Sequence, residues 1–291
     1  MQLLDMQAGV ISTGQLIGAG VTSRVIDRLS LAWERVSPGI YLTRPPIWES
    51  AAWAGLLRAG DGAAVGGLAA CFLEGALRDA PRSVLIWAER AKSGFHLGPW
   101  SVEFRRGTRP SYRFPPRTRI HASLLDVAST SNELDTAATM TSALSRGVAE
   151  PGRLLDELGS RAHQRHRSMI ETLCDPTSKG VHSLIEWVFL RDVVRAHRLP
   201  EPELQVTKSA GRVDQLYDRF DTIVELDGIR DHSDWSKDMY RDNEHLLEHH
   251  TLTLRYGLND VMGRPCAVSS QVLRRFRSRG WRGRPKGCRR C

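Results

Sequence analysis

Residues 211–227, GRVDQLYDRFDTIVELD, decide how the C-terminal part of the chain folds. Polar and apolar side chains alternate in two segments, 211–218 and 221–227, and alternation with a period of two is typical of β-strands. A short loop joins the two segments as an antiparallel hairpin. If this loop is symmetric, Asp214 lies directly opposite Glu225, with Cβ atoms about 5 Å apart. The sequence therefore predicts a hairpin that brings two carboxylates together.

A third carboxylate belongs to the same face of this hairpin. Asp227 lies two residues after Glu225, whereas the even-numbered residues of the strand form an apolar face. Like charges that face each other across a sheet are destabilising, so Asp214→Asn would raise the stability of the metal-free protein. A divalent cation relieves the repulsion, and Mg²⁺ is typically held by one or two carboxylates with phosphate oxygens. The alternative is a solvated acidic face without a ligand.

Two further side chains are candidates for the same site. Ser183 predicts the start of an apolar helix that runs to about His197, and Glu186 lies in its first turn, where the helix dipole favours an acid. His232 follows the acidic strand in a loop, where it is either solvated or a general base or phosphate contact. A helix over 238–250 is predicted after it, with no functional role.

The first 48 residues are predicted to form a winged helix-turn-helix, because their helix, turn and strand patterns occur in the order of that fold. The expected elements are a helix from Ser12-Thr13, a Gly-Ala-Gly turn at 18–20, a helix over 24–29 and strands at 33–36 and 40–43.

Three arginines of this block are candidate DNA contacts. In a winged helix the second helix enters the major groove and the hairpin contacts the DNA backbone. Arg24 and Arg28 share one face of the second helix, and Arg35 lies in the hairpin. The alternative is a small packing module, since the block holds only four arginines against three acidic residues.

Residues 49–175 are predicted to form a mixed α/β connector. Its expected elements are helical regions at 49–58 and 132–173 and strands at 83–89 and 100–106. Between Ser101 and Ile120 there are six arginines and one glutamate, interleaved with aromatic residues. Such a pattern suits a nucleic-acid surface, although a solvated, arginine-rich sheet edge has the same composition.

The positive charge is concentrated at the C-terminus. The formal net charge is +8, and residues 274–291 contain eight arginines, one lysine and no acidic residue. The other 32 basic and 33 acidic residues nearly cancel. A cationic tail indicates a polyanionic partner, with a solubilising tail as the alternative. If the tail contacts DNA, deleting 274–291 would reduce the salt dependence of binding.

The composition also excludes several classes of protein. The 291 residues are enough for about two domains. The longest apolar-and-glycine run, 63–73, is too short to span a bilayer, and the first residues lack signal-peptide features. Five scattered cysteines favour reduced thiols and a cytoplasmic location. Cys288 and Cys291 form one C-x-x-C pair, but structural zinc takes four ligands.

Several motifs together resemble a known family. They are Ser183-Leu-Ile-Glu186, Gln205, Arg212-Val-Asp214, Val224-Glu-Leu-Asp-Gly228, His232, Arg241-Asp242 and Leu254-Arg255-Tyr256. This set resembles the very-short-patch-repair-like endonuclease domain of the PD-(D/E)XK superfamily. Residues 1–48 with their continuation resemble the N-terminal domain of the AbiEi antitoxin of type IV toxin–antitoxin systems. The two domains are commonly fused, and the segment from Arg279-Gly-Trp281 to Cys288-x-x-Cys291 resembles the end of such proteins.

The resemblance implies a metal-dependent phosphodiesterase. Asp214 and Glu225 would hold Mg²⁺ or Mn²⁺, with Glu186 as a further ligand or as a group that positions water. The superfamily motif E-x-K has a lysine where this chain has Asp227, and that lysine normally polarises the attacking water or steadies phosphate charge. Lys208 or His232 could replace it, or Asp227 could be a further metal ligand.

The expected architecture is therefore α+β. It comprises a winged helix-turn-helix at 1–48, the connector at 49–175, a restriction-endonuclease-like αβββαβ core at 181–281 and a basic tail at 282–291. The leading function is a DNA-binding, metal-dependent endonuclease. The alternative is a non-catalytic, antitoxin-like transcriptional regulator with a cognate toxin. Convergence of Asp214, Glu225 and Glu186 within reach of one metal ion would favour the enzyme.

Overall fold

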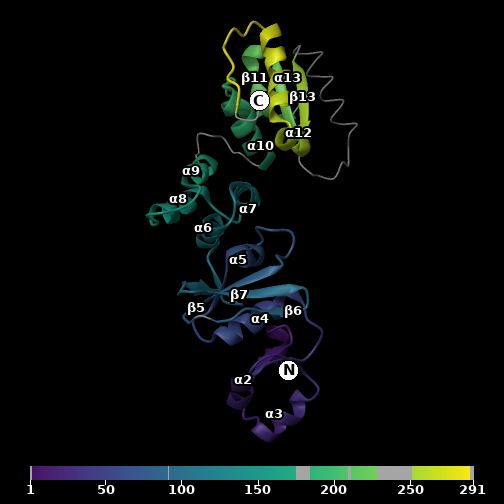
Figure 1. Cartoon of the computed structure of the whole chain (residues 1–291), viewed down its shortest axis with the longest axis vertical. Coiled ribbons are helices and arrows are strands. Elements are labelled where there is room, and N and C mark those ends of the chain that lie inside the picture. Colours follow the sequence, from purple (N-terminus) through teal and green to yellow (C-terminus); the bar gives the residue numbers. More distant parts are fainter. Residues whose placement is uncertain (1, 91, 175–183, 209–210, 228–250, 289–291) are drawn as a thin grey trace. The chain divides into compact units, whose positions relative to one another are not determined.

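The computed structural model describes residues 2–90, 92–174, 184–208, 211–227 and 251–288 (Figure 1). They form a mixed α+β protein, as the sequence predicts. The chain divides into two compact units: unit 1 comprises Met1–Thr139 and Arg146–His166, and unit 2 comprises Met140–Ser145 and Arg167–Cys291. No helix in the described part of the chain is long and apolar enough to cross a bilayer.

Unit 1 begins with three short helices and a three-stranded antiparallel sheet of order β1-β3-β2. Their bounds are α1 Gln2–Met6, β1 Val10–Ser12, α2 Thr13–Gly18, α3 Ser23–Ser30, β2 Glu34–Ser37 and β3 Ile40–Leu42. Ser12 begins α2 in a capping box, because its side chain accepts from the Gln15 N–H while the Gln15 side chain accepts from the Ser12 N–H. The elements predicted for this segment are confirmed within one or two residues at each end.

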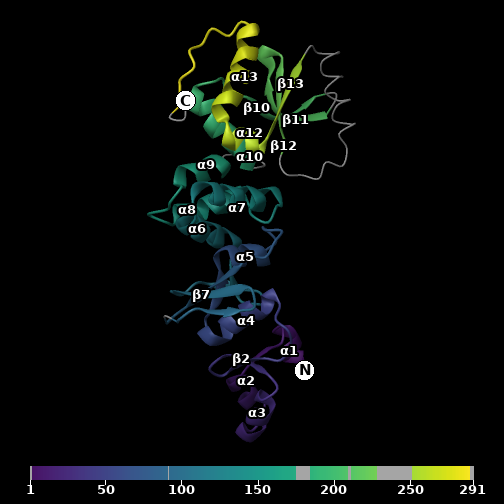
Figure 2. The same ribbon diagram turned by 45° about the vertical axis from the view of Figure 1, so that its right-hand side comes forward.

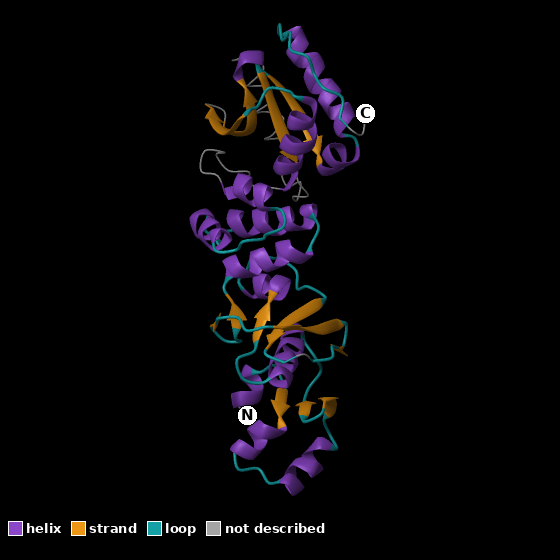
Figure 3. Ribbon diagram, turned by 60° about the vertical axis from the view of Figure 1, so that its left-hand side comes forward, coloured by secondary structure: helices purple, strands orange, loops and turns teal. Residues whose placement is uncertain are grey.

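The rest of unit 1 is built on a six-stranded mixed sheet of order β6-β7-β5-β4-β9-β8. The elements are α4 Trp48–Ala59, β4 Ala64–Gly66, α5 Gly67–Leu73, β5 Ser83–Ala88, β6 Phe95–Leu97, β7 Trp100–Arg106, β8 Ser111–Tyr112 and β9 Arg117–Thr118. Helices α4 and α5 lie on opposite sides of this sheet (Figures 1 and 3). Helix α4 and strands β5 and β7 agree with the predicted elements within one residue at each end.

The helical region expected over 132–173 contains three helices. They are α7 Glu133–Ser145, α8 Pro151–Gly159 and α9 Arg167–Cys174, preceded by α6 Ile120–Thr130. Pro151 begins α8, because proline lacks an N–H and fits the first turn of a helix better than its interior.

The two sides of the expected boundary at residue 48 share one hydrophobic cluster. Val10 and Leu42 pack in the same cluster as Trp53 and Ile86. The buried Ser50 hydroxyl, on α4, also donates to the carbonyl oxygen of Ala8 at 2.7 Å. The first three-stranded sheet is therefore packed onto the element that follows it.

Unit 2 contains a four-stranded sheet of order β10-β11-β12-β13, in which β12 and β13 are parallel and the other pairs are antiparallel (Figure 2). Its elements are α10 Leu184–Val188, a π-helical segment η2 Phe189–Arg195, β10 Glu203–Lys208, β11 Gly211–Tyr217, a 3₁₀ turn η3 Asp218–Phe220, β12 Thr222–Asp227, β13 Leu252–Gly257, α12 Leu258–Gly263 and α13 Pro265–Ser278. The helix predicted at 238–250 lies outside the described residues.

Helices α12 and α13, which the expected αβββαβ order lacks, lie beside this sheet (Figure 2). The fully buried Phe276 of α13 stacks on Phe220 with ring centroids 4.4 Å apart and contacts Tyr217 at 4.7 Å. On η2, Phe189 stacks on Tyr256 of β13. These aromatic contacts form much of the packing between the helices and the sheet.

Candidate functional site

The hairpin at 211–227 has the predicted register. The observed pairs are Gln215 with Val224, Leu216 with Ile223 and Tyr217 with Thr222. The loop is closed by η3 and by Asp221, whose φ of 44° lies in the left-handed region that aspartate tolerates. The ladder ends at the Gln215–Val224 pair, and Asp214 and Glu225 are the next residues of the two strands.

The Asp214 carboxylate lies where the β11–β12 ladder ends. Its Oδ2 accepts a hydrogen bond from the backbone N–H of Leu226 at 2.9 Å, so a side chain replaces a main-chain partner there. This contact holds Asp214 against β12 beside Glu225.

Gln205 of β10 connects Asp214 to the helix that precedes the sheet. Its Nε2 lies 3.2 Å from Glu186 Oε1 and 3.5 Å from Asp214 Oδ1. The backbone of Gln205 has a φ of 54°, which is uncommon for a residue in a strand. No role was predicted for Gln205 from the sequence. The antiparallel register of β10 on β11, which brings it opposite Asp214, is the feature that identifies it.

Two of the carboxylates are buried. Glu186 is 5% exposed and Glu225 is 8% exposed. Strand β12 lies between β11 and β13 and is buried through Leu226, so a solvated acidic face is excluded for Glu225. Asp227, in contrast, is exposed. Burying a carboxylate is costly unless hydrogen bonds or a cation compensate its charge, and such groups mark candidate binding sites.

A guanidinium lies beside Asp227 at the end of β12. Arg255 of β13 pairs in register with Glu225, and its Nη1 lies 3.9 Å from Asp227 Oδ2. Lys208, a candidate replacement for that lysine, instead pairs with Asp218 at 3.2 Å. No role was predicted for Arg255, because its place beside Glu225 and Asp227 depends on a parallel pairing between strands that are far apart in the chain.

The three carboxylates do not form one closed set of metal ligands. Among the described residues, the group of three ligand atoms that all lie within 4.8 Å of one another is His197, Cys266 and Cys288. Glu186 and Asp214 are instead bridged by the Gln205 amide. The expected convergence of Asp214, Glu225 and Glu186 on one metal ion is therefore not observed among the described residues, and His232 lies outside them.

The arginines predicted to contact DNA are exposed. Arg24 and Arg28 project from α3, and Arg35 lies on β2. On the other side of α3, Ile26 is buried with Leu16 of α2, so the helix is anchored by its apolar face.

The arginine-rich stretch 101–120 is partly internal. Arg117 is buried and pairs with Glu74, and Arg109 pairs with Asp126 at 3.5 Å and lies over the Trp87 ring. These two arginines therefore stabilise unit 1. Three others, Arg106, Arg113 and Arg119, are exposed.

The basic C-terminus is also partly committed to packing. Arg275 donates to the carbonyl oxygen of Asp221 at 2.8 Å, and Arg279 pairs with the Asp221 carboxylate at 3.4 Å. Lys286 donates its backbone N–H to the carbonyl oxygen of His197 at 2.9 Å. Residues 282–288 are thus attached to unit 2.

No family model matches the sequence, and no curated protein is significantly similar to it.

Proposed function

We propose that the protein binds DNA and that unit 2 hydrolyses phosphodiester bonds with the help of Mg²⁺ or Mn²⁺. The observation that carries this proposal is the grouping of Glu186, Gln205, Asp214 and Glu225 at the end of the β11–β12 ladder. Buried carboxylates that lie close together supply the oxygen ligands that a hard divalent cation takes.

The donor atoms fit a hard divalent cation. Carboxylate and amide oxygens are the ligands that Mg²⁺ prefers, and this ion commonly takes one or two carboxylates and completes its shell with water and phosphate oxygens. Asp214 and Glu225 would hold it. Bound there, the cation would supply a nucleophilic hydroxide and polarise the phosphoryl oxygen.

The other groups have roles that follow from their contacts. The Gln205 amide orients Glu186 and Asp214, because it is within 3.5 Å of both carboxylates. Arg255 would steady the negative charge that develops on the phosphate, since a guanidinium fits phosphate geometry in a bidentate manner. Asp227 then acts as the partner that holds Arg255 in place.

DNA binding is assigned to the first part of unit 1. The order helix, strand, two helices and two antiparallel strands, with a sheet of order β1-β3-β2, is typical of a winged helix. Exposed Arg24 and Arg28 on α3 and Arg35 on β2 would then contact phosphates or base edges.

A second candidate is a non-catalytic, antitoxin-like regulator that binds an operator and a cognate toxin. One observation favours it: Asp227 occupies the position of the motif lysine and is paired with Arg255. In that case the carboxylate group would be a remnant, and α3 with the β2–β3 hairpin would carry the function.

A plasmid-nicking assay separates the two candidates. Wild type is incubated with supercoiled DNA and Mg²⁺, Mn²⁺ or EDTA, beside Glu225→Gln and the control Glu203→Gln, an exposed carboxylate on the same sheet. We expect cation-dependent nicking by wild type and the control and none by Glu225→Gln. DNA binding without nicking under every condition would exclude the enzyme and favour the regulator.

A further inference from the structure

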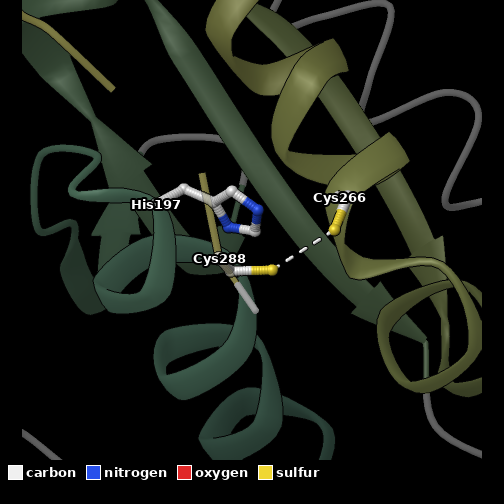
Figure 4. Close-up of side chains that lie close together, drawn as sticks. All are labelled: His197, Cys266 and Cys288. Atoms are coloured by element: carbon white, nitrogen blue, oxygen red, sulfur yellow. Dashed lines mark hydrogen bonds between the residues drawn. The ribbon is translucent and has the colours of Figure 1, made fainter. Parts of the chain in front are cut away.

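A second cluster of chemically reactive side chains lies in unit 2, formed by residues other than the carboxylates described above. Ligand atoms of His197, Cys266 and Cys288 all lie within 4.8 Å of one another (Figure 4). The two sulfur atoms are 3.4 Å apart, well beyond the roughly 2.0 Å of a disulfide bond.

These spacings match those of ligands around a tetrahedral zinc ion. With Zn–S bonds of about 2.3 Å and Zn–N bonds of about 2.0 Å, two sulfur ligands are about 3.8 Å apart, and a sulfur and a nitrogen are about 3.5 Å apart. The observed sulfur separation of 3.4 Å is within a few tenths of an ångström of this value. A small adjustment of side chains would therefore seat the ion.

The histidine is oriented as a metal ligand. His197 is 4% exposed, and its Nδ1 lies 3.0 Å from the carbonyl oxygen of Val193. A carbonyl oxygen only accepts, so Nδ1 carries the proton and Nε2 has the lone pair that a metal requires. A ring N–H donated to a backbone carbonyl is the usual arrangement that fixes a metal-binding histidine.

The two cysteines are positioned by separate elements of unit 2. Cys266 lies in the first turn of α13, where the helix dipole stabilises a negative charge. Cys288 is held near His197 because Lys286, two residues earlier, donates its backbone N–H to the His197 carbonyl. The ligands come from three separate segments: His197 from the helical turn after η2, Cys266 from the start of α13 and Cys288 from the segment after α13.

We propose that His197, Cys266 and Cys288 bind a structural zinc ion that fastens the C-terminal segment to unit 2. The class of ligand follows from the donors, because two thiolates and an imidazole select Zn²⁺ over the hard cations that carboxylates hold. Cys291 lies outside the described residues and is not part of the proposed site.

Zinc content of the purified full-length chain tests the proposal. After dialysis against a chelating resin, wild type is expected to retain about one zinc per chain, whereas Cys288→Ser and Cys266→Ser retain almost none. Cys288 lies beyond the last helix, so its substitution removes a sulfur without disturbing a packed element. The control is Cys71→Ala, a buried cysteine of unit 1.

Cobalt substitution provides a readout independent of stability. Wild type reconstituted with Co²⁺ is expected to show thiolate-to-cobalt charge-transfer and the intense visible bands of a tetrahedral site, and His197→Gln should weaken them. Three results would overturn the proposal: no bound zinc and no such spectrum in reduced wild type, zinc binding that survives both cysteine substitutions, or a Cys266–Cys288 disulfide in freshly purified protein.

Discussion

At the scale of single residues, Asp214 is the group whose environment departs most from the sequence expectation. From sequence, its negative charge faces that of Glu225, with Asp227 on the same face, so neutralising Asp214 should stabilise the metal-free protein. In the structure its two oxygens face donors, the N–H of Leu226 at 2.9 Å and the amide of Gln205 at 3.5 Å. An asparagine has one acceptor oxygen and cannot satisfy both.

The structure therefore reverses the expected sign for Asp214→Asn. We expect a loss of about 1–2 kcal/mol in the free energy of unfolding, the cost of leaving a partly buried donor without an acceptor. Urea denaturation in EDTA, with Asp218→Asn on the same hairpin as the control, measures it. A gain in stability would show that repulsion between Asp214 and Glu225 outweighs the hydrogen bonds of Asp214.

Gln205→Leu tests the bridge between Glu186 and Asp214. Leucine fills a similar volume but donates nothing, so the two carboxylates lose a shared donor. Unfolding free energy is expected to fall by about 1–3 kcal/mol, and Thr207→Val, at an exposed position of the same strand, should change it little. Equal effects of the two substitutions would show that the bridge contributes nothing specific.

At the scale of elements, the close packing of α4 on the large sheet depends on Gly55. A Cβ there would lie 2.7 Å from Ile86 Cγ1 and 2.8 Å from Val102 Cγ1. Gly55→Ala is expected to lower stability by about 1–3 kcal/mol, because overpacking outweighs the gain in helix propensity. At Gly152 of α8 no atom lies within 4 Å of the added Cβ, so Gly152→Ala should stabilise by up to about 1 kcal/mol. Thermal unfolding of both variants gives the comparison, and equal signs would contradict it.

The contact between α6 and α8 introduces a pH dependence into unit 1. His121 of α6 accepts the backbone N–H of Glu150 at 3.1 Å, and partial burial lowers the pKa of this histidine. The folded state thus favours neutral His121, and its contribution is lost as pH falls from about 6.5 through the lowered pKa. The melting temperature of wild type should drop more between pH 7 and pH 5 than that of His121→Gln. Parallel decreases would show that His121 is not involved.

Elements were predictable from sequence where the information is local. The register of the 211–227 hairpin follows from one short loop and a period of two, and Ser12 begins its helix as expected. The parallel pairing of β12 with β13 depends on a long connection, and no local pattern reveals it. For the same reason Arg255 received no role, and His197 could not be connected to Cys266 and Cys288.

At the scale of the whole molecule, the proposed DNA affinity has two candidate sources, the exposed arginines of α3 and β2 and the basic C-terminus. Deleting residues 274–291 would remove the fully buried Phe276 and would unfold unit 2 rather than remove a tail. Substitutions at exposed arginines are the sound test. Arg24→Ala, Arg28→Ala and Arg35→Ala combined should reduce the salt slope of DNA binding by about three, one for each lost phosphate contact. Arg282→Ala with Arg284→Ala measures the tail separately, and an unchanged slope in the triple variant would remove α3 from the interface.

Binding of a hard divalent cation to the carboxylate group of unit 2 is tested most directly by thermal unfolding of zinc-loaded protein with and without millimolar Mg²⁺ or Mn²⁺. A ligand that binds only the folded state raises the melting temperature. Either cation should raise the melting temperature of wild type but not that of Asp214→Asn or Glu225→Gln. Cys266→Ser should respond like wild type, because Cys266 is not one of the residues proposed to hold Mg²⁺ or Mn²⁺. A wild-type melting temperature that neither cation changes would contradict the metal site and with it the enzymatic function.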